Sequence, residues 1–172
     1  MVIDLHRCTG CAACVIGCKN ENNLSEGVAW SDKITRTTGT FPNVSYEYVP
    51  TLCNHCANAP CVAACPTEAM YKTEDGLTMI DADKCIGCRY CMAACPYGVI
   101  YFNDEEPHPR WQDNTAVIPG GTTTPIELVE DVGGTTIPYY NPDRETTMPG
   151  IRPQGVVEKC TFCDHRIGNG QL

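Results

Sequence analysis

Residues 85–96 read CIGCRYCMAACP, in which three cysteines recur at every third position and a fourth follows four residues later, directly before proline. This C-x2-C-x2-C-x3-C-P spacing is typical of bacterial ligand runs for 4Fe-4S clusters. Three thiolates at this spacing lie on a tight loop whose backbone curls around one cube of iron and sulfide. We expect the fourth cysteine at the start of a helical turn, pointing away, so that it ligates a neighbouring cluster.

The other cysteines repeat this run along the chain, which has 14 cysteines among 172 residues, in four groups. Residues 8–18 have the same spacing but are followed by Lys19, and residues 53–65 read C-x2-C-x4-C-x3-C before Pro66. The fourth group is a single C-x2-C pair. The predicted cluster ligands are therefore Cys8, Cys11, Cys14, Cys18, Cys53, Cys56, Cys61, Cys65, Cys85, Cys88, Cys91, Cys95, Cys160 and Cys163.

Cysteine in such numbers has two other uses. A disulfide framework needs an oxidising compartment, and pairs within groups this dense would be strained. Structural zinc also uses C-x2-C, but a zinc site takes two such pairs rather than four cysteines within 11 residues. An assay for iron and acid-labile sulfide separates these uses, because zinc without sulfide would exclude the cluster interpretation.

The second and third groups are self-similar, since CVAACP at 61–66 matches CMAACP at 91–96. Residues 70–72 and 77–80 flank Thr-Glu-Asp-Gly at 73–76, which indicates a hairpin, and residues 98–102 read as another short strand. This alternation of cysteine loops and short strands predicts one ferredoxin-like unit with two clusters over residues 53–102. One cluster is then held by Cys53, Cys56, Cys61 and Cys95, and the other by Cys85, Cys88, Cys91 and Cys65.

The first cysteine group can then share clusters only with the fourth cysteine group. If the fourth cysteine of this run also ligates the neighbouring cluster, Cys18 joins Cys160 and Cys163. The first three cysteines of the chain then lack a fourth ligand. Eight further thiolates are needed for two clusters, and six are present. We expect that a C-terminal piece with two more cysteines is missing from this sequence; the alternative is a genuine loss of a cluster.

These groups predict an α+β fold of two bacterial-ferredoxin-like units with a long irregular insert. One unit is internal, at 53–102, and the other combines 1–52 with 152–172. The insert, at 103–151, lies in an acidic stretch with 8 of the 13 prolines between residues 103 and 159, so we expect no helix there. A short strand is expected at Ile126–Val129. The insert is interpreted either as a docking surface or as a surface wrap.

Residues 19–52 contain no cysteine. Their alternating stretch Val44–Val49 predicts a strand that leads into the second group. Trp30, Tyr46 and Tyr48 are interpreted either as shields for a cluster or as ordinary core residues.

Charged side chains beside the loops have two interpretations. Positive charge there raises the reduction potential of a cluster, whereas the alternative is a solvent-facing side chain. The residues concerned are Lys19, Lys84, Arg89, Lys159 and Arg166. His55 lies between two expected ligands, and we interpret it as a neighbour of the cluster or a surface residue, because every ligand of its group is already a cysteine.

Composition excludes several classes of function. The net charge is −9, and such a field repels nucleic acid and anionic membrane surfaces. No window approaches 18 uninterrupted apolar residues, so no membrane span is expected. We expect no secretion signal in the first residues, and no Ser–His–Asp set, phosphate loop or distinctive pair of catalytic carboxylates.

The four-group pattern, with KCTFCDHR at 159–166, resembles the four-cluster iron–sulfur subunits of molybdopterin oxidoreductases, such as dimethyl sulfoxide, polysulfide, thiosulfate and tetrathionate reductases. A narrower similarity, to the small subunits of respiratory arsenate reductases, rests on GTFPNV at 39–44, TLCNHC at 51–56, RWQD at 110–113 and the long insert. In this family the fourth group continues to two further cysteines, the last followed by proline.

The resemblance implies a non-catalytic subunit that relays single electrons through four 4Fe-4S clusters. Its expected partners are a large molybdopterin catalytic subunit that reduces an oxyanion, and a quinol-oxidising membrane subunit or a cytochrome. Co-export with the large subunit would give a periplasmic address, with the cytoplasm as the alternative. A second hypothesis, from the acidic composition, is a free soluble polyferredoxin that shuttles between enzymes.

Overall fold

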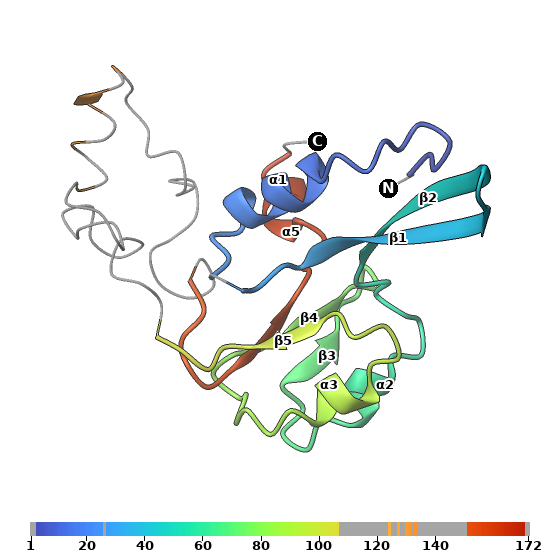
Figure 1. The fold of residues 1–172 in the computed structure, drawn as a ribbon. Coiled ribbons are helices and arrows are strands. Elements are labelled where there is room, and N and C mark those ends of the chain that lie inside the picture. The colour runs from blue at the N-terminus through green and yellow to red at the C-terminus, as the bar shows by residue number, and fades with distance from the viewer. Residues whose placement is uncertain are drawn as a thin grey trace.

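The computed structural model describes residues 3–25, 27–106 and 151–170, together with Thr124, Glu127, Glu130, Asp131 and Gly133. These residues form short helices and three two-stranded antiparallel sheets (Figure 1), in agreement with a mixed α and β fold. Among them, no helix is both long and apolar enough to cross a membrane.

The strand expected at Ile126–Val129 is wrong at Glu127, the only one of its residues that is described, because the backbone there is helical. The Thr124 N–H donates to the Glu127 carboxylate at 2.8 Å, and the Glu127 N–H donates back to Thr124 Oγ1 at 3.3 Å. This reciprocal pair is a capping box, which favours a helix start. The rest of the insert lies outside the described residues.

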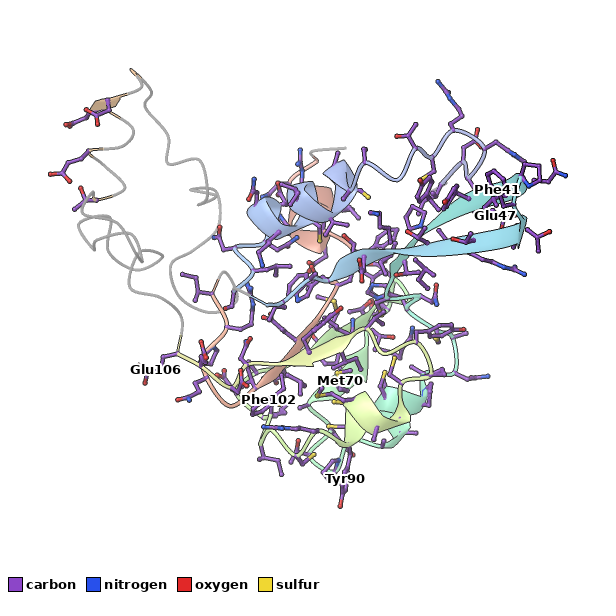
Figure 2. All side chains as sticks on the ribbon, viewed as in Figure 1. Phe41, Glu47, Met70, Tyr90, Phe102 and Glu106 are labelled. Atoms are coloured by element: carbon purple, nitrogen blue, oxygen red, sulfur yellow. The ribbon has the colours of Figure 1, made fainter. Side chains whose placement is uncertain are left out.

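The longest element is a hairpin of β1 (Ser31–Thr40) and β2 (Asn43–Leu52), paired from Ser31 with Leu52 to Thr40 with Asn43. The prediction of a strand at Val44–Val49 is confirmed, and the strand is longer at both ends. Threonine-rich β1 suits a strand, since β-branched residues favour extended backbone. The hairpin extends away from the rest of the molecule (Figure 1), and Phe41 lies at its tip, 91 % exposed (Figure 2).

The two smaller sheets lie beside the second and third cysteine groups. The expected hairpin is confirmed as β3 (Met70–Lys72) paired with β4 (Thr78–Ile80). The expected last strand is β5 (Ile100–Phe102), and it pairs with β6 (Val157–Lys159). The segment 53–102 therefore takes the partner of its last strand from the C-terminal part of the chain.

Each helix is coupled to a cysteine group. The helices are α1 (Ala13–Glu21), α2 (Pro60–Ala63), α3 (Tyr90–Ala94) and α5 (Asp164–Gly168). The expectation that the fourth cysteine starts a helical turn is wrong, because the third cysteine of the first three groups lies in the first turn. The fourth lies one turn further on, as Cys95 does at the C-cap of α3. A spacing of four residues matches one turn of helix.

Two small cores hold these elements together. The first contains buried side chains from the second and third groups and their strands, and β6 contributes to it; its members are Ala59, Cys61, Met70, Cys91, Ile100 and Val157. The second joins the N-terminal and C-terminal segments through Leu24, Val28, Trp30 and Cys160. Figure 2 shows Met70 in the interior, far from the hairpin tip.

A buried ion pair also ties the two ends of the chain. Arg152 Nε donates to the Glu158 carboxylate at 2.5 Å, and the two residues are 7 % and 2 % exposed. The same guanidinium donates to the carbonyls of Asn22 and Asn23 at 2.9 and 3.0 Å. Asn103 adds a hydrogen bond to Glu158 at 3.2 Å. Arg152 therefore connects the end of α1 to the strand that precedes the fourth cysteine group.

Candidate metal centres

Two neighbouring cavities are each lined by four cysteines. The first is lined by Cys53, Cys56, Cys61 and Cys95. The second is lined by Cys65, Cys85, Cys88 and Cys91. Each cavity thus takes three cysteines from one group and the fourth from the other group. This is the grouping that the spacing predicts for an adjacent pair of clusters.

The four C-x2-C loops have the same backbone conformation. In each, the residue before the second cysteine is left-handed, with φ between 44° and 69°; these residues are Gly10, His55, Gly87 and Phe162. The tight turn aims the N–H of that residue at the preceding sulfur, as in His55 N–H to Cys53 Sγ at 3.5 Å and Phe162 N–H to Cys160 Sγ at 3.3 Å. The fourth group therefore has the loop geometry of the other three.

The outer cysteines are only partly brought together. Cys18 packs against the core that contains the buried Cys160, and the charge of Cys163 acts on Cys18. Cys8 and Cys11 lie on a loop that contacts β2 at Tyr48, whereas Cys14 lies in the first turn of α1, and both Cys11 and Cys14 are exposed. A side chain at Gly10 would overlap the Tyr48 ring there, with a Cβ 2.5 Å from Tyr48 Cδ1.

The predicted aromatic residues have different places. Trp30 is 2 % exposed and packs in the core that contains Cys160, whereas Tyr46 is 62 % exposed on the hairpin. Tyr48 covers the first cysteine loop at Gly10. Only Trp30 and Tyr48 therefore contact the regions around expected ligands.

Burial opposes ionisation of several thiols. It raises the pKa of both Cys91 and Cys160 to about 11, and it also raises the pKa of Cys18 and Cys61. Cys65 differs: burial acts upward on its pKa, but the N–H of Met70 and the Thr67 hydroxyl outweigh burial and lower it. A metal deprotonates a coordinating thiol outright. Iron bound in these cavities would therefore keep the thiols ionised in spite of their burial.

The donor set of each inner cavity fits an iron–sulfur cluster. Each cavity is lined by four cysteine thiols that come from two different loops. Four thiolates are the ligand set of one 4Fe-4S cluster.

The His55 ring is held in one orientation by a backbone hydrogen bond. Its Nδ1 accepts a hydrogen bond from the Thr78 N–H at 3.0 Å, so the proton lies on Nε2, which is buried without a partner among the described residues. Burial, followed by the charges of Lys159 and Lys72, lowers its pKa to about 4, so the ring is neutral. His55 does not line either cysteine cavity, and its ring packs against Phe162 beside the second cysteine loop.

The basic side chains separate into surface and buried groups. Lys84 pairs with Asp81 at 3.1 Å, Arg166 pairs with Glu21 at 3.2 Å, and the Arg89 guanidinium stacks 3.7 Å from the centre of the Phe102 ring. Lys19 donates to the carbonyls of Ser25 and Val28 at 2.6 and 2.9 Å. Only Lys159 among these five lines a cysteine cavity and is also buried, at 2 % exposure.

Lys72 is a basic residue near the site that the sequence did not indicate. Its ammonium donates to the carbonyls of His55 and Cys56 at 3.2 and 3.0 Å, and so braces the second cysteine loop. Lys72 is 7 residues from the nearest cysteine in sequence, and only the pairing of β3 with β4 brings it to the loop. No local sequence signal predicts this contact.

The crossed cysteine cavities and the repeated loops define a bacterial-ferredoxin-type iron–sulfur protein. The description "4Fe-4S dicluster domain" matches residues 44–111 and, in a second family of that description, residues 84–165. The chain is 55 % identical over 170 residues to the arsenate respiratory reductase iron-sulfur subunit of Shewanella sp. (strain ANA-3), covering 99 % of this chain and 73 % of that subunit.

Two further relatives are more distant. A selenate reductase subunit of Mesobacillus selenatarsenatis is 40 % identical over 177 residues, covering 100 % of this chain and 54 % of that protein. The menaquinone reductase iron-sulfur cluster-binding subunit of Nitratidesulfovibrio vulgaris is 37 % identical over 179 residues, covering 97 % and 59 %. The chain belongs to the iron–sulfur electron-transfer subunits of the molybdopterin oxidoreductase family. It spans between about half and three quarters of the length of these three relatives.

Proposed function

We propose that this chain relays single electrons between a large molybdopterin catalytic subunit and an electron donor, within an anaerobic respiratory oxyanion reductase of the arsenate type. The crossed pair of cysteine cavities carries this proposal, because interleaved ligand sets bring two redox centres close together. A bound 4Fe-4S cluster supplies one-electron chemistry. The side chains of the chain hold, bury and insulate it.

In this proposal all 14 cysteines are ligands. Cys53, Cys56, Cys61 and Cys95 serve one inner cluster, and Cys65, Cys85, Cys88 and Cys91 serve the other. Cys18, Cys160 and Cys163 contribute to one outer cluster, and Cys8, Cys11 and Cys14 to a fourth. Residues 53–102 form the inner unit, and 1–52 with 152–172 form the outer unit, which needs further ligands. The loop amides donate to the sulfurs and stabilise their negative charge.

The partners follow from the family. The names of the relatives support an oxyanion or a quinone as the terminal reactant of the complex, and the 55 % identity favours arsenate over selenate, thiosulfate or tetrathionate. A quinol-oxidising membrane subunit or a cytochrome is the proposed donor. Co-export with the large subunit would place the complex in the periplasm; a cytoplasmic complex is the alternative.

The test is anaerobic purification of the tagged chain from its native host, with assays for iron, acid-labile sulfide and molybdenum. We expect iron and sulfide in equal amounts, a large co-purifying chain that contains molybdenum, and arsenate reduction by the complex. A small monomer with intact clusters and no molybdenum would support a free shuttle. Zinc without sulfide would exclude electron transfer.

A further inference from the structure

Lys159 is buried between two sets of cysteines. It lies on β6 and is 2 % exposed, and its ammonium donates to the backbone carbonyls of Thr78 and Cys160, the latter at 2.9 Å. Among the described residues, no carboxylate lies within ion-pair distance of this ammonium. A buried ammonium is costly unless negative charge compensates it.

With clusters bound, cysteine thiolates on both sides would supply the compensating charge. Lys159 lines the cavity of Cys53, Cys56, Cys61 and Cys95. Burial lowers the pKa of Lys159, and the charges of Cys53 and Cys61 from that cavity and of Cys160 from the outer set oppose this shift. Lys159 also directly precedes Cys160 in the chain. One positive charge thus faces an inner site and an outer site together.

We propose that Lys159 supplies a positive charge shared by the inner site of Cys53 and the outer site of Cys160, and that this charge raises the reduction potentials of both. The inference rests on the proposed function, because it concerns clusters at these sites. Reduction adds one electron, delivered by the donor subunit, to a centre that its thiolates already make negative. A fixed cation stabilises the reduced form more than the oxidised form, and net charge and hydrogen bonds to sulfur are established determinants of cluster potential.

The experiment uses the anaerobically purified full chain and its Lys159→Gln, Lys159→Arg and Lys159→Met variants. Glutamine retains donors for the Thr78 and Cys160 carbonyls but removes the charge, and arginine retains the charge. Lys84→Gln is the matched control, because Lys84 also directly precedes a cysteine in sequence but its side chain is 62 % exposed. Iron and sulfide content are measured first, and midpoint potentials are then measured by redox titration followed by electron paramagnetic resonance.

We expect Lys159→Gln to retain the clusters and to lower the midpoint potentials of two of them, whereas Lys159→Arg and Lys84→Gln keep the original potentials. Unchanged potentials in a fully loaded Lys159→Gln variant would overturn the inference. Loss of clusters in Lys159→Gln and Lys159→Met but not in Lys159→Arg would support a charge shared by both sites, since arginine retains the charge and the neutral side chains do not. Loss in all three would assign Lys159 a packing role and overturn it. An original chain without iron and sulfide would refute the proposed function itself.

Discussion

The imidazole ring of His55 meets the phenyl ring of Phe162 edge to face, with ring centroids 5.7 Å apart and an interplanar angle of 75°. The two residues occupy equivalent positions, since each precedes the second cysteine of its loop and has a left-handed φ. His55 belongs to an inner loop and Phe162 to the outer loop of the fourth group. This contact therefore fixes the spacing between two loops that are more than 100 residues apart in sequence.

The first prediction concerns this ring contact. Edge-to-face aromatic pairs contribute roughly 0.5–1.5 kcal/mol beyond area burial. We expect His55→Ala and Phe162→Ala each to lower the thermal midpoint of the anaerobic holoprotein, and the double variant to lower it by less than the sum. Circular dichroism measures the midpoints. Strict additivity of the two changes would mean that the rings do not stabilise each other.

The second prediction concerns the crossing of ligands between the inner cavities. Cys95 follows Cys91 in sequence but lines the cavity of Cys56. We therefore expect Cys95→Ser to remove the same electron paramagnetic resonance signal as Cys56→Ser, and Cys65→Ser to remove the same signal as Cys88→Ser. Each variant should lose either one whole cluster, which is about four irons, or a single iron from that cluster. If Cys95→Ser instead affects the signal that Cys88→Ser affects, the ligands do not cross.

The third prediction concerns the buried pair of Arg152 and Glu158. Removal of one partner from a buried pair costs about 3–5 kcal/mol, because the other charge stays buried alone. We expect Arg152→Met to destabilise the holoprotein by this amount, and Arg152→Met with Glu158→Met to recover much of the loss. The exposed pair of Lys84 and Asp81 is the control, since Lys84→Met should cost about 0–1 kcal/mol. Equal costs for Arg152→Met and Lys84→Met would contradict a buried ion pair.

The fourth prediction concerns Gly87 in the third cysteine loop. Its φ is 66°, and a Cβ there would overlap the carbonyl oxygen of Gly155. We expect Gly87→Ala to push the C-terminal segment away and to accelerate loss of iron to a chelator. Gly17→Ala is the matched control, because Gly17 lies in α1 with no atom within 4 Å of the added Cβ. That change should stabilise the helix by roughly 0.5–1 kcal/mol. Similar rates of iron loss in both variants would refute the steric argument.

The grouping of cysteines in the inner cavities was predictable because the spacing of the ligands encodes it locally. The hairpin of β3 and β4 was predictable for the same reason, since Asp75 and Gly76 lie between two short strands. The partner of β5 was not, because β6 is only three residues long and lies beyond the insert. Nothing within three residues of sequence specifies such a distant pairing.

Two other elements were not predicted from the sequence, for different reasons. Strand β1 has exposed side chains on both faces, so it lacks the alternation of apolar and polar residues that reveals a half-buried strand. The helical backbone at Glu127 was signalled by Thr124 three residues earlier, but the density of prolines outweighed that signal. The buried position of Lys159 depends on tertiary packing, and the sequence could not separate it from Lys84.

Strand β6 also sets how late in synthesis the inner cavities can close. It supplies a wall to each inner cavity, through Lys159 in one and Val157 in the other. Synthesis reaches β6 about 55 residues after β5, which takes roughly 3–11 s at about 5–20 residues per second. Until then all eight inner cysteines belong to a chain that lacks the strand that closes their cavities. The inner cavities therefore gain this wall only after the C-terminal segment has been made and has paired with β5.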